Sequence, residues 1–326
     1  MKKGDNKMGE ERKINLEIAK LIGQPINPAL PSPVALSAVA DVSTVGPGEK
    51  VFYFASEDTD ADEIYEVNTA TGKIVVIKKD PLSDTQLTFT GLNSRLQYVL
   101  LDSVLASPDV DVLGRKKSSI SRGMDKLEVK RLIDGMIAVA DEIAVGSAED
   151  LYDVIMSAKH ALEDYGDNYV MLCGSAVKEG IDNYDKKHVA TFQYNVTLPA
   201  KLKELGIEVV KVFGKIKTGT AANNEADSGT ESALLDTNKF VLVARDSTIA
   251  KGKPVIFVRR EIPADIAKLM GADVDGAERG LWVNPAPVQV AGANTLGYGV
   301  YGYESVVLAI TNKRAIKKSA DLSAIL

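Results

Sequence analysis

The chain has 326 residues, of which 45% are hydrophobic and 26% charged, a balance typical of a globular protein with a buried core. Its formal net charge of −6 shows no excess of Lys and Arg, which disfavours a dedicated DNA-reading surface but leaves open a protein that encloses nucleic acid. The single cysteine, Cys173, excludes an intrachain disulfide and a Cys-based zinc cluster, and it suits a reducing compartment.

The first fifty residues predict a short helix followed by an extended strap. Residues 9–22 place Ile14, Ile18 and Leu21 on one side of an amphipathic helix, and the charges in this segment exclude a signal-peptide core. Residues 24–50 carry five of the twelve prolines, which bar a helix and favour an extended path. Because no apolar run reaches the about 20 residues of a membrane span, we expect a soluble, cytoplasmic protein without membrane contact.

Residues 51–92 predict β-structure. The segments VFYFAS and TQLTFTGL read as strands, and EIYEV and KIVVIKK form a hairpin around the turn Asn68–Gly72. The hairpin tip is polar, so we expect it to project and to rest on a partner, since an isolated hairpin is marginally stable.

Two helices are predicted next. The first covers residues 93–107, with a cap at Asn93 or Ser94 and a stop at Pro108. The second covers about residues 119–144, where apolar residues from Val129 to Ala144 recur at steps of three and four. Its length of about 39 Å exceeds what most globular helices require.

The second half alternates between helices and strands. We expect helices at 147–164 (capped by Ser147), 197–205 and 262–271, and strands at NYVMLCG, IEVVKVFG, KFVLVARD and KPVIFVRRE, the last two adjacent in one sheet. Residues 217–232 form a polar loop rich in turn-forming residues. LWVNPAPVQV, AGANTLGYGVYG and YESVVLAITN close the chain.

Two glycine motifs resemble phosphate-binding loops, but both lack essential parts of such a loop. Gly297, Gly299 and Gly302 match G-x-G-x-x-G, yet a β-rich run follows where the cofactor-binding motif needs a helix. We therefore interpret them as a flexible loop that leads into a C-terminal strand. Gly214 and Gly219 have P-loop spacing, but Thr220 stands where the phosphate-binding Lys belongs.

No catalytic, cofactor-binding or metal-binding constellation is predicted. His160 and His188 have no metal-ligand spacing, and Cys173 ends an apolar strand, where a buried structural cysteine is expected. The run DTDADE begins like a calcium-binding loop but has Glu63 at the glycine position and Thr69 at the bidentate position. We predict no cofactor and no enzymatic activity.

In element order the chain looks like the major capsid proteins of tailed double-stranded DNA bacteriophages, which have the α+β Hong Kong 97-type fold. Three segments carry the resemblance: SRGMDKLEVKRLIDGMIAVADEIA is similar to the family's spine helix, AEDLYDVIMSAKHALEDYGDNYVMLCGSAVKEG to its entry into the axial domain, and YGYESVVLAITNKRA to its late returning strand. The resemblance covers nearly the whole chain but contains no sharp fingerprint.

The resemblance implies a domain organisation. Residues 1–48 would be the N-terminal arm, 49–92 the extended E-loop, 93–146 the peripheral domain with the spine helix at about 119–144, rejoined by 300–326, and 147–299 the axial domain. The loop at 217–232 would point at the centre of a pentamer or hexamer. Gly297, Gly299 and Gly302 would be a hinge where the chain leaves the axial domain.

The resemblance also implies partners. The protein would assemble with itself into pentamers and hexamers of an icosahedral shell that encloses double-stranded DNA without sequence-specific contact. It would be part of the virion, assembled in the bacterial host cytoplasm with a scaffolding protein, a portal and a decoration protein.

Two charged groups are candidate contacts between subunits. An acidic group near the hairpin base would pair with a basic group that precedes the spine helix, or both would be solvated patches. The acidic group is Glu57, Asp58, Asp60, Asp62 and Glu63, and the basic group is Arg115, Lys116, Lys117 and Arg122.

Three alternatives remain open from the sequence. The first is an encapsulin-like cellular shell with the same fold, which would package cargo proteins. The second is a cytosolic α/β enzyme with a site around Cys173, Asp185 and His188. The third is a phage tail or connector component that forms rings or tubes.

Overall fold

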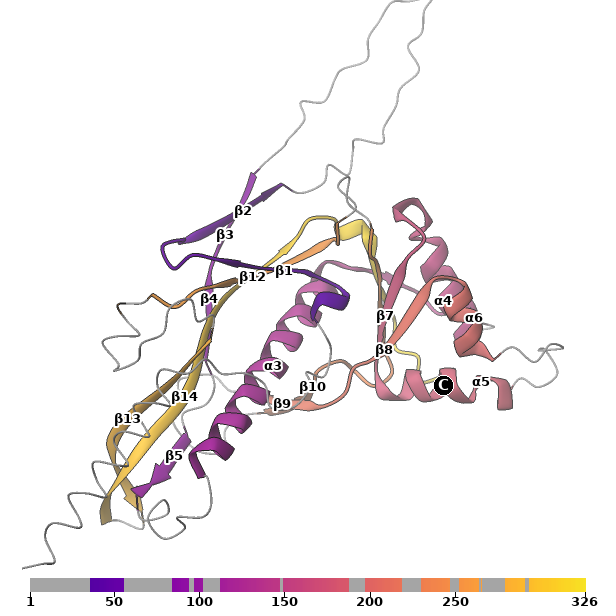
Figure 1. Cartoon of the computed structure of the whole chain (residues 1–326). Coiled ribbons are helices and arrows are strands. Elements are labelled where there is room, and N and C mark those ends of the chain that lie inside the picture. The colour runs from indigo at the N-terminus through magenta and orange to yellow at the C-terminus, as the bar shows by residue number, and fades with distance from the viewer. Residues whose placement is uncertain are drawn as a thin grey trace, which may run out of the picture.

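The computed structural model describes residues 36–55, 84–93, 97–101, 112–146, 149–187, 197–218, 230–246, 252–263, 265, 279–290 and 293–326. Within these residues the protein is a mixed α+β structure in which a long helix, α3, joins two lobes (Figure 1). One lobe contains a six-stranded sheet and the other a five-stranded sheet covered by α4, α5 and α6. The predicted helix at 9–22 and the hairpin around Asn68–Gly72 lie outside the described residues. Of the helix predicted at 262–271, Ile262, Pro263 and Asp265 are described, and the first two are not helical.

The central strand of the six-stranded sheet is β14 (Ala293–Ile310). Tyr303 and Glu304 pair with both β13 and β4, so these two strands lie on opposite edges of β14. One edge pairs with β13 (Arg279–Val290) and β12 (Val255–Arg260), and the other with β5 (Gln97–Leu100) and β4 (Thr90–Asn93). The strand β1 (Asp41–Val45) extends the sheet by pairing parallel with β12.

The three glycines of the G-x-G-x-x-G motif lie inside β14, so the predicted flexible loop is wrong and the predicted strand begins earlier than expected. Gly297, Gly299 and Gly302 are in register with β13, and the first two also pair with β5. Pairing on both edges outweighs the low intrinsic strand preference of glycine, which the local sequence cannot reveal.

The five-stranded sheet separates two hydrophobic cores. Its strand order is β6 (Asp141–Ile143), β15 (Ile316–Ser319), β11 (Phe240–Ala244), β7 (Tyr169–Cys173) and β8 (Ile207–Lys211). All five residues of β7 and of β11 are buried, because both faces of the sheet are covered. Val170 and Leu172 face the core that contains α3, whereas Met171 faces the core beneath α4, α5 and α6.

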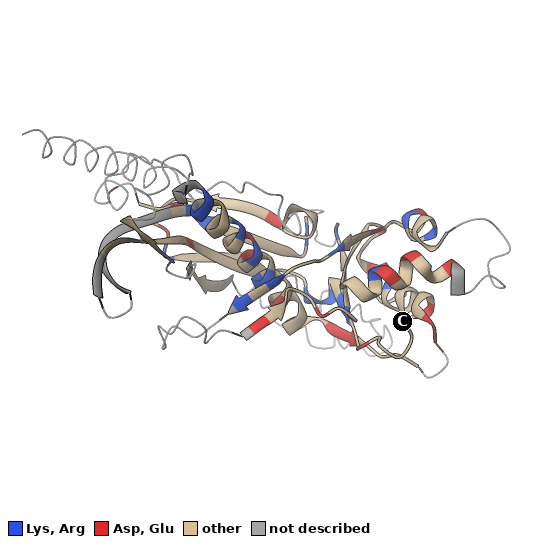
Figure 2. Cartoon of the chain, turned by 90° about the horizontal axis from the view of Figure 1, so that it is seen from below, with Lys and Arg blue, Asp and Glu red and all other residues tan. Residues whose placement is uncertain are grey.

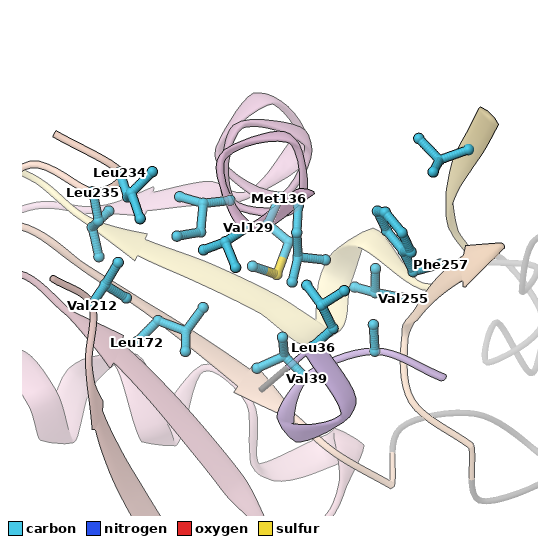
Figure 3. Close-up of a cluster of buried hydrophobic side chains, with 14 of the residues drawn as sticks. Leu36, Val39, Val129, Met136, Leu172, Val212, Leu234, Leu235, Val255 and Phe257 are labelled. Carbon is cyan, nitrogen blue, oxygen red and sulfur yellow. The ribbon is translucent and has the colours of Figure 1, made fainter. Parts of the chain in front are cut away.

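The first of these cores continues into the six-stranded sheet and holds the lobes together. Figure 3 shows Val129 and Met136 of α3 beside Val255 and Phe257 of β12, with Leu172 of β7 in the same cluster. Leu36 of the short 3₁₀ helix η1 (Leu36–Ala38) and Val39, which follows it, pack against the same cluster. One continuous core therefore fixes α3 against both sheets.

The helix α3 spans Val112–Val139, so the predicted helix exists but is shifted from about 119–144. Its last helical bond runs from the Ala140 amide to the Met136 carbonyl, and Asp141 then begins β6. Ile143 and Ala144 fit the helical period, but residues 141–143 pair with β15, and Lys317 forms a 2.7 Å ion pair with Asp141. Strand pairing overrides the local helical pattern here.

The other α-helices agree with the sequence predictions to different degrees. α6 (Leu198–Glu204) confirms the expected helix, and α4 (Leu151–His160) lies within the range predicted for it. The cap of α4 is Asp150, which forms a capping box with Asp153, and not Ser147, which lies outside the described residues. α5 (Ser175–Lys187) was not predicted, although Val177, Ile181 and Tyr184 show its buried side.

Two strand assignments also differ from the sequence analysis. The helix predicted at 93–107 is wrong at residues 97–100, which form β5 because they pair with β14. KFVLVARD and KPVIFVRRE do form strands, β11 and β12, but they belong to different sheets and are not adjacent. The predicted strands at NYVMLCG and IEVVKVFG are confirmed as β7 and β8.

Two ribbons complete the described structure. β2 (Val51–Ala55) pairs with β3 (Asp84–Thr88), and β9 (Lys215–Thr218) pairs with β10 (Thr230–Ala233). The second ribbon shows that the ends of the predicted polar loop at 217–232 are strands, and its middle lies outside the described residues. The short 3₁₀ helices η2 (Glu163–Tyr165) and η3 (Lys313–Ala315) cover the chain turns after α4 and β14.

Candidate functional site

A cluster of buried ionic side chains joins α3 to the six-stranded sheet. Asp125 and Glu128 extend from α3, Arg279 begins β13 and Glu304 lies on β14, and all four residues are at most 7% exposed. Nη1 of Arg279 is 2.5 Å from Oδ1 of Asp125, and its other two nitrogens contact Glu128 and Glu304. Arg259 of β12 adds a bidentate pair with Glu128, at 2.7 and 3.0 Å.

The cluster holds three carboxyl groups against two guanidinium groups. Burial, reinforced by the neighbouring Glu128 carboxylate, raises the pKa of Glu304 from 4.5 to about 8, although the cation Arg279 opposes this shift. The pKa of Arg279 is also raised, since the attraction of Glu304, Glu128 and Asp125 outweighs the opposing effect of its own burial. Protonation of Glu304 is the change that would balance these charges, and the contacts of Arg279 join α3 to the sheet.

This arrangement predicts a pH-dependent stability that Glu304→Gln removes. Because the native pKa of about 8 exceeds the unfolded value of 4.5, the native state holds a proton that the unfolded state releases, and stability falls as the pH rises from about 5 to 8. We expect the Tm of the unchanged protein to fall by at least about 3 °C more than that of the variant over this range. Thermal melts of both proteins, with Glu204→Gln as an exposed control, check the prediction; equally steep profiles would contradict it.

The outer face of α3 carries exposed and half-exposed basic residues. Arg115 and Arg122 are exposed and lie seven residues apart on one side of the helix, and the half-exposed Lys126 and Lys130 continue the same line. Lys116 is half-buried and lies about 100° around the helix from Arg115. The four basic candidates therefore lie within α3, not before it as predicted, and they do not share one face.

The structure leaves the proposed acidic partner of these residues untested. Glu57, Asp58, Asp60, Asp62 and Glu63 all lie outside the described residues. The pairing between the acidic and basic groups thus stays a prediction.

The residues offered for an enzymatic site have structural roles where they are described. The thiol of Cys173 is buried, donates to the carbonyl oxygen of Val210 at 3.6 Å, and has its pKa raised by burial to about 12. The carboxylate of Asp185 accepts from the Leu198 amide at the start of α6. His160 is exposed beside Glu163, and His188 lies outside the described residues.

Two other kinds of site are absent from the described part of the chain. It contains no group of three or more His, Cys, Asp or Glu side chains that could hold a metal ion. It also contains no helix long and apolar enough to cross a membrane.

The sequence contains only weak signals of the buried cluster. Asp125 and Glu128, three residues apart, fall on the same side of the helix as the apolar residues Met124 and Leu132. In the sequence between Arg279 and Lys313, Glu304 is the one charged residue. Their partner Arg279 follows a segment without a clear pattern, and only the fold brings it near.

Comparison with known proteins shows which fold this is. The chain matches no protein-family profile and no curated protein sequence. It is similar in structure to the capsid protein of a native GTA particle, at 14% identity and a TM-score of 0.53, with 91% of this chain and 92% of that chain covered. It is similar also to a phage-related protein from Bordetella bronchiseptica RB50, at 13% identity and a TM-score of 0.53, with 90% and 93% covered.

These similarities extend over nearly the full length of both chains, so they concern the whole architecture and not one lobe. Sequence identity this low carries information on the fold alone. The chain has the Hong Kong 97-type fold of phage capsid proteins, as the order of its elements predicted.

Proposed function

We propose that this protein is a structural capsid protein that assembles with itself into pentamers and hexamers of an icosahedral shell enclosing double-stranded DNA. The observation that carries the proposal is the match to capsid proteins over about nine-tenths of both chains. The buried thiol and the capping role of Asp185 support a structural and not an enzymatic role. The protein would then be a virion component, assembled in the host cytoplasm with a scaffolding protein, a portal and a decoration protein.

The fold suggests how the parts would serve such a shell. We assign α3, about 42 Å long, as the spine helix that keeps the subunit rigid. Residues 1–48 would be the N-terminal arm, and 49–92 the E-loop, whose base is the ribbon β2–β3. Tyr53 on this ribbon is 60% exposed, which supports a contact with a neighbouring subunit.

The proposed domain ranges do not coincide with the two sheets. The proposed axial domain, 147–299, contains most of the five-stranded sheet, but β12 and β13 within it pair with β14 of the peripheral sheet. Conversely β15, in the range 300–326 that rejoins the peripheral domain, pairs with β11. We therefore propose that the chain crosses between the domains more than once, and that Gly297, Gly299 and Gly302 let the β13–β14 ribbon flex as a paired unit.

We also propose that the acidic run 57–63 contacts the start of α3 on a neighbouring subunit, chiefly at Lys116 and Lys117. Exposed ion pairs contribute only about 0–1 kcal/mol each, but a shell repeats them many times. The double reversal Lys116→Glu with Lys117→Glu is expected to weaken assembly and reduce its salt dependence, measured by light scattering across a salt series. Lys203→Glu with Lys313→Glu changes the net charge equally elsewhere; unchanged assembly in the first variant would contradict the pairing.

Size-exclusion chromatography with light scattering tests the function itself. A shell protein gives particles many times heavier than the 34.9 kDa chain, alone or after a scaffold is added. A monomer or dimer that no scaffold converts, with a ligand-dependent melting shift, would support the enzyme alternative instead. An encapsulin-like shell shares the fold, so the contents of purified shells, DNA or protein, separate these two.

A further inference from the structure

The outer face of α3 presents a continuous line of cations. Arg115, Arg122, Lys126 and Lys130 follow one another at steps of seven, four and four residues, so they project within a sector of about 80°. The line is about 22 Å long at the helical rise of 1.5 Å per residue. Figure 2 shows that basic segments, in blue, recur along the long helix.

Carboxylates within this stretch of helix are turned away from the line. The acidic residues between Arg115 and Lys130 are Asp125 and Glu128, and both are buried against the sheet and paired with Arg279. Asp134 lies beyond the end of the line, where it forms a 2.7 Å pair with Lys130. Between Arg115 and Lys130 the helix thus places its acids inside and its bases outside, and the Lys130 end of the line is partly neutralised by the exposed Asp134.

The ribbon β9–β10 extends the basic surface. Nζ of Lys126 donates to the carbonyl oxygen of Lys215 at 2.9 Å, which places β9 beside the helix. The Lys215 side chain is 65% exposed and its Nζ is 3.8 Å from Glu231, a loose pair at the surface. We call Arg115, Arg122, Lys126, Lys130 and Lys215 the basic face of α3.

We propose that the basic face of α3 binds the phosphate backbone of packaged double-stranded DNA and so lines the interior of the shell. The choice of DNA as the partner rests on the proposed function, whereas the basic face itself is defined by the contacts described above. Between the cations the outward positions hold Ser119 and Gly123, with no aromatic, Asn or Gln side chain to read bases. This chemistry fits phosphate contact without sequence selection.

The charge density predicts weak binding by each copy. A duplex carries one charge per about 1.7 Å, so about 13 phosphate charges lie along a 22 Å stretch, more than five cations can neutralise. Single subunits would bind weakly, and the repetition of the face over a shell would provide the avidity. A chain with a net charge of −6 can in this way hold DNA without a basic composition.

The test is the salt dependence of DNA binding by the full-length protein, measured by fluorescence anisotropy with a duplex of about 30 base pairs. Five phosphate contacts predict a slope of log K against log salt of about −4.5. Arg115→Gln with Arg122→Gln should make this slope shallower by about 1.8 and weaken binding about tenfold or more at low salt. Duplexes of different sequence should bind alike.

A matched control separates this face from net charge. Lys203→Gln with Lys313→Gln removes the same charge from exposed positions on α6 and η3, and it should leave the slope unchanged. An equal loss in both double variants, or none in the first, would overturn the assignment. So would a first variant that keeps DNA binding but no longer assembles, because the face would then contact an acidic segment of another copy.

Failure of this inference and failure of the proposed function give different results. Shells that form normally but show an unchanged slope in the Arg115 and Arg122 variant would overturn the basic face and leave the function intact. Duplex binding that depends on the two arginines, in a protein that never forms shells, would support the surface and overturn the function.

Discussion

Replacing Arg279 with methionine is expected to lower the free energy of unfolding by about 3–5 kcal/mol, among the largest single-residue effects in the chain. The guanidinium group contacts Asp125, Glu128 and Glu304, and methionine leaves these buried carboxyl groups without their shared cation. Denaturant unfolding of the two proteins measures the difference. Arg122→Met removes an exposed arginine from α3 and should change the free energy by less than about 0.5 kcal/mol.

A second variant tests whether the carboxyl groups and not the shape of the side chain cause this loss. Adding Asp125→Asn to Arg279→Met removes one acidic partner of the guanidinium group, so the double variant should be less destabilised than the sum of the two single changes. Additive effects of the two changes, or a stable Arg279→Met protein, would show that the cluster does not hold α3 to the sheet.

The second large effect is expected at Gly174, which follows β7. A Cβ atom added there would lie 2.1 Å from the Asp236 carbonyl oxygen and 2.4 Å from that of Thr237. Both atoms belong to backbone that is fixed by hydrogen bonds from Gly174 to Lys239 and from Ala176 to Thr237. The clash cannot be relieved by a side-chain rotation, so Gly174→Ala should destabilise the protein by about 3 kcal/mol.

Gly123 provides a control, because its replacement by alanine should change the free energy of unfolding in the opposite direction. It lies within α3, and an added Cβ atom there meets no atom within 4 Å. Gly123→Ala should therefore stabilise the protein by up to about 1 kcal/mol, through helix propensity. Denaturant unfolding of both variants measures the pair of effects, and a Gly174→Ala protein as stable as the unchanged one would contradict the packing described for the end of β7.

Local sequence predicted elements whose patterns are strong over a whole segment. The long helix was recognised because Val129, Leu132 and Met136 recur at helical spacing over several turns, and β7 because five consecutive residues are apolar. The end of the helix was misplaced because Ile143 fits the helical period, while pairing with β15 makes it a strand. The spacing of apolar residues indicates which side of a segment is buried, but it does not indicate which strand the segment pairs with.

Long-range pairing accounts for most of what the sequence did not reveal. The local sequence of β5 predicts a helix. The segment is a strand because it pairs with β14, whose residues lie nearly two hundred positions away in the chain. The buried cluster depends on the same kind of contact, since Arg279 and Asp125 are 154 positions apart. The resemblance to capsid proteins is nevertheless visible in the sequence, because it rests on the order of elements and not on which strands pair.

Negative-stain electron microscopy of the purified full-length protein, with and without a scaffolding protein, tests the central proposal most directly. A subunit with this fold and function is expected to give closed shells, or curved sheets built from hexamers. Only dispersed monomers or dimers under both conditions would contradict the proposed function.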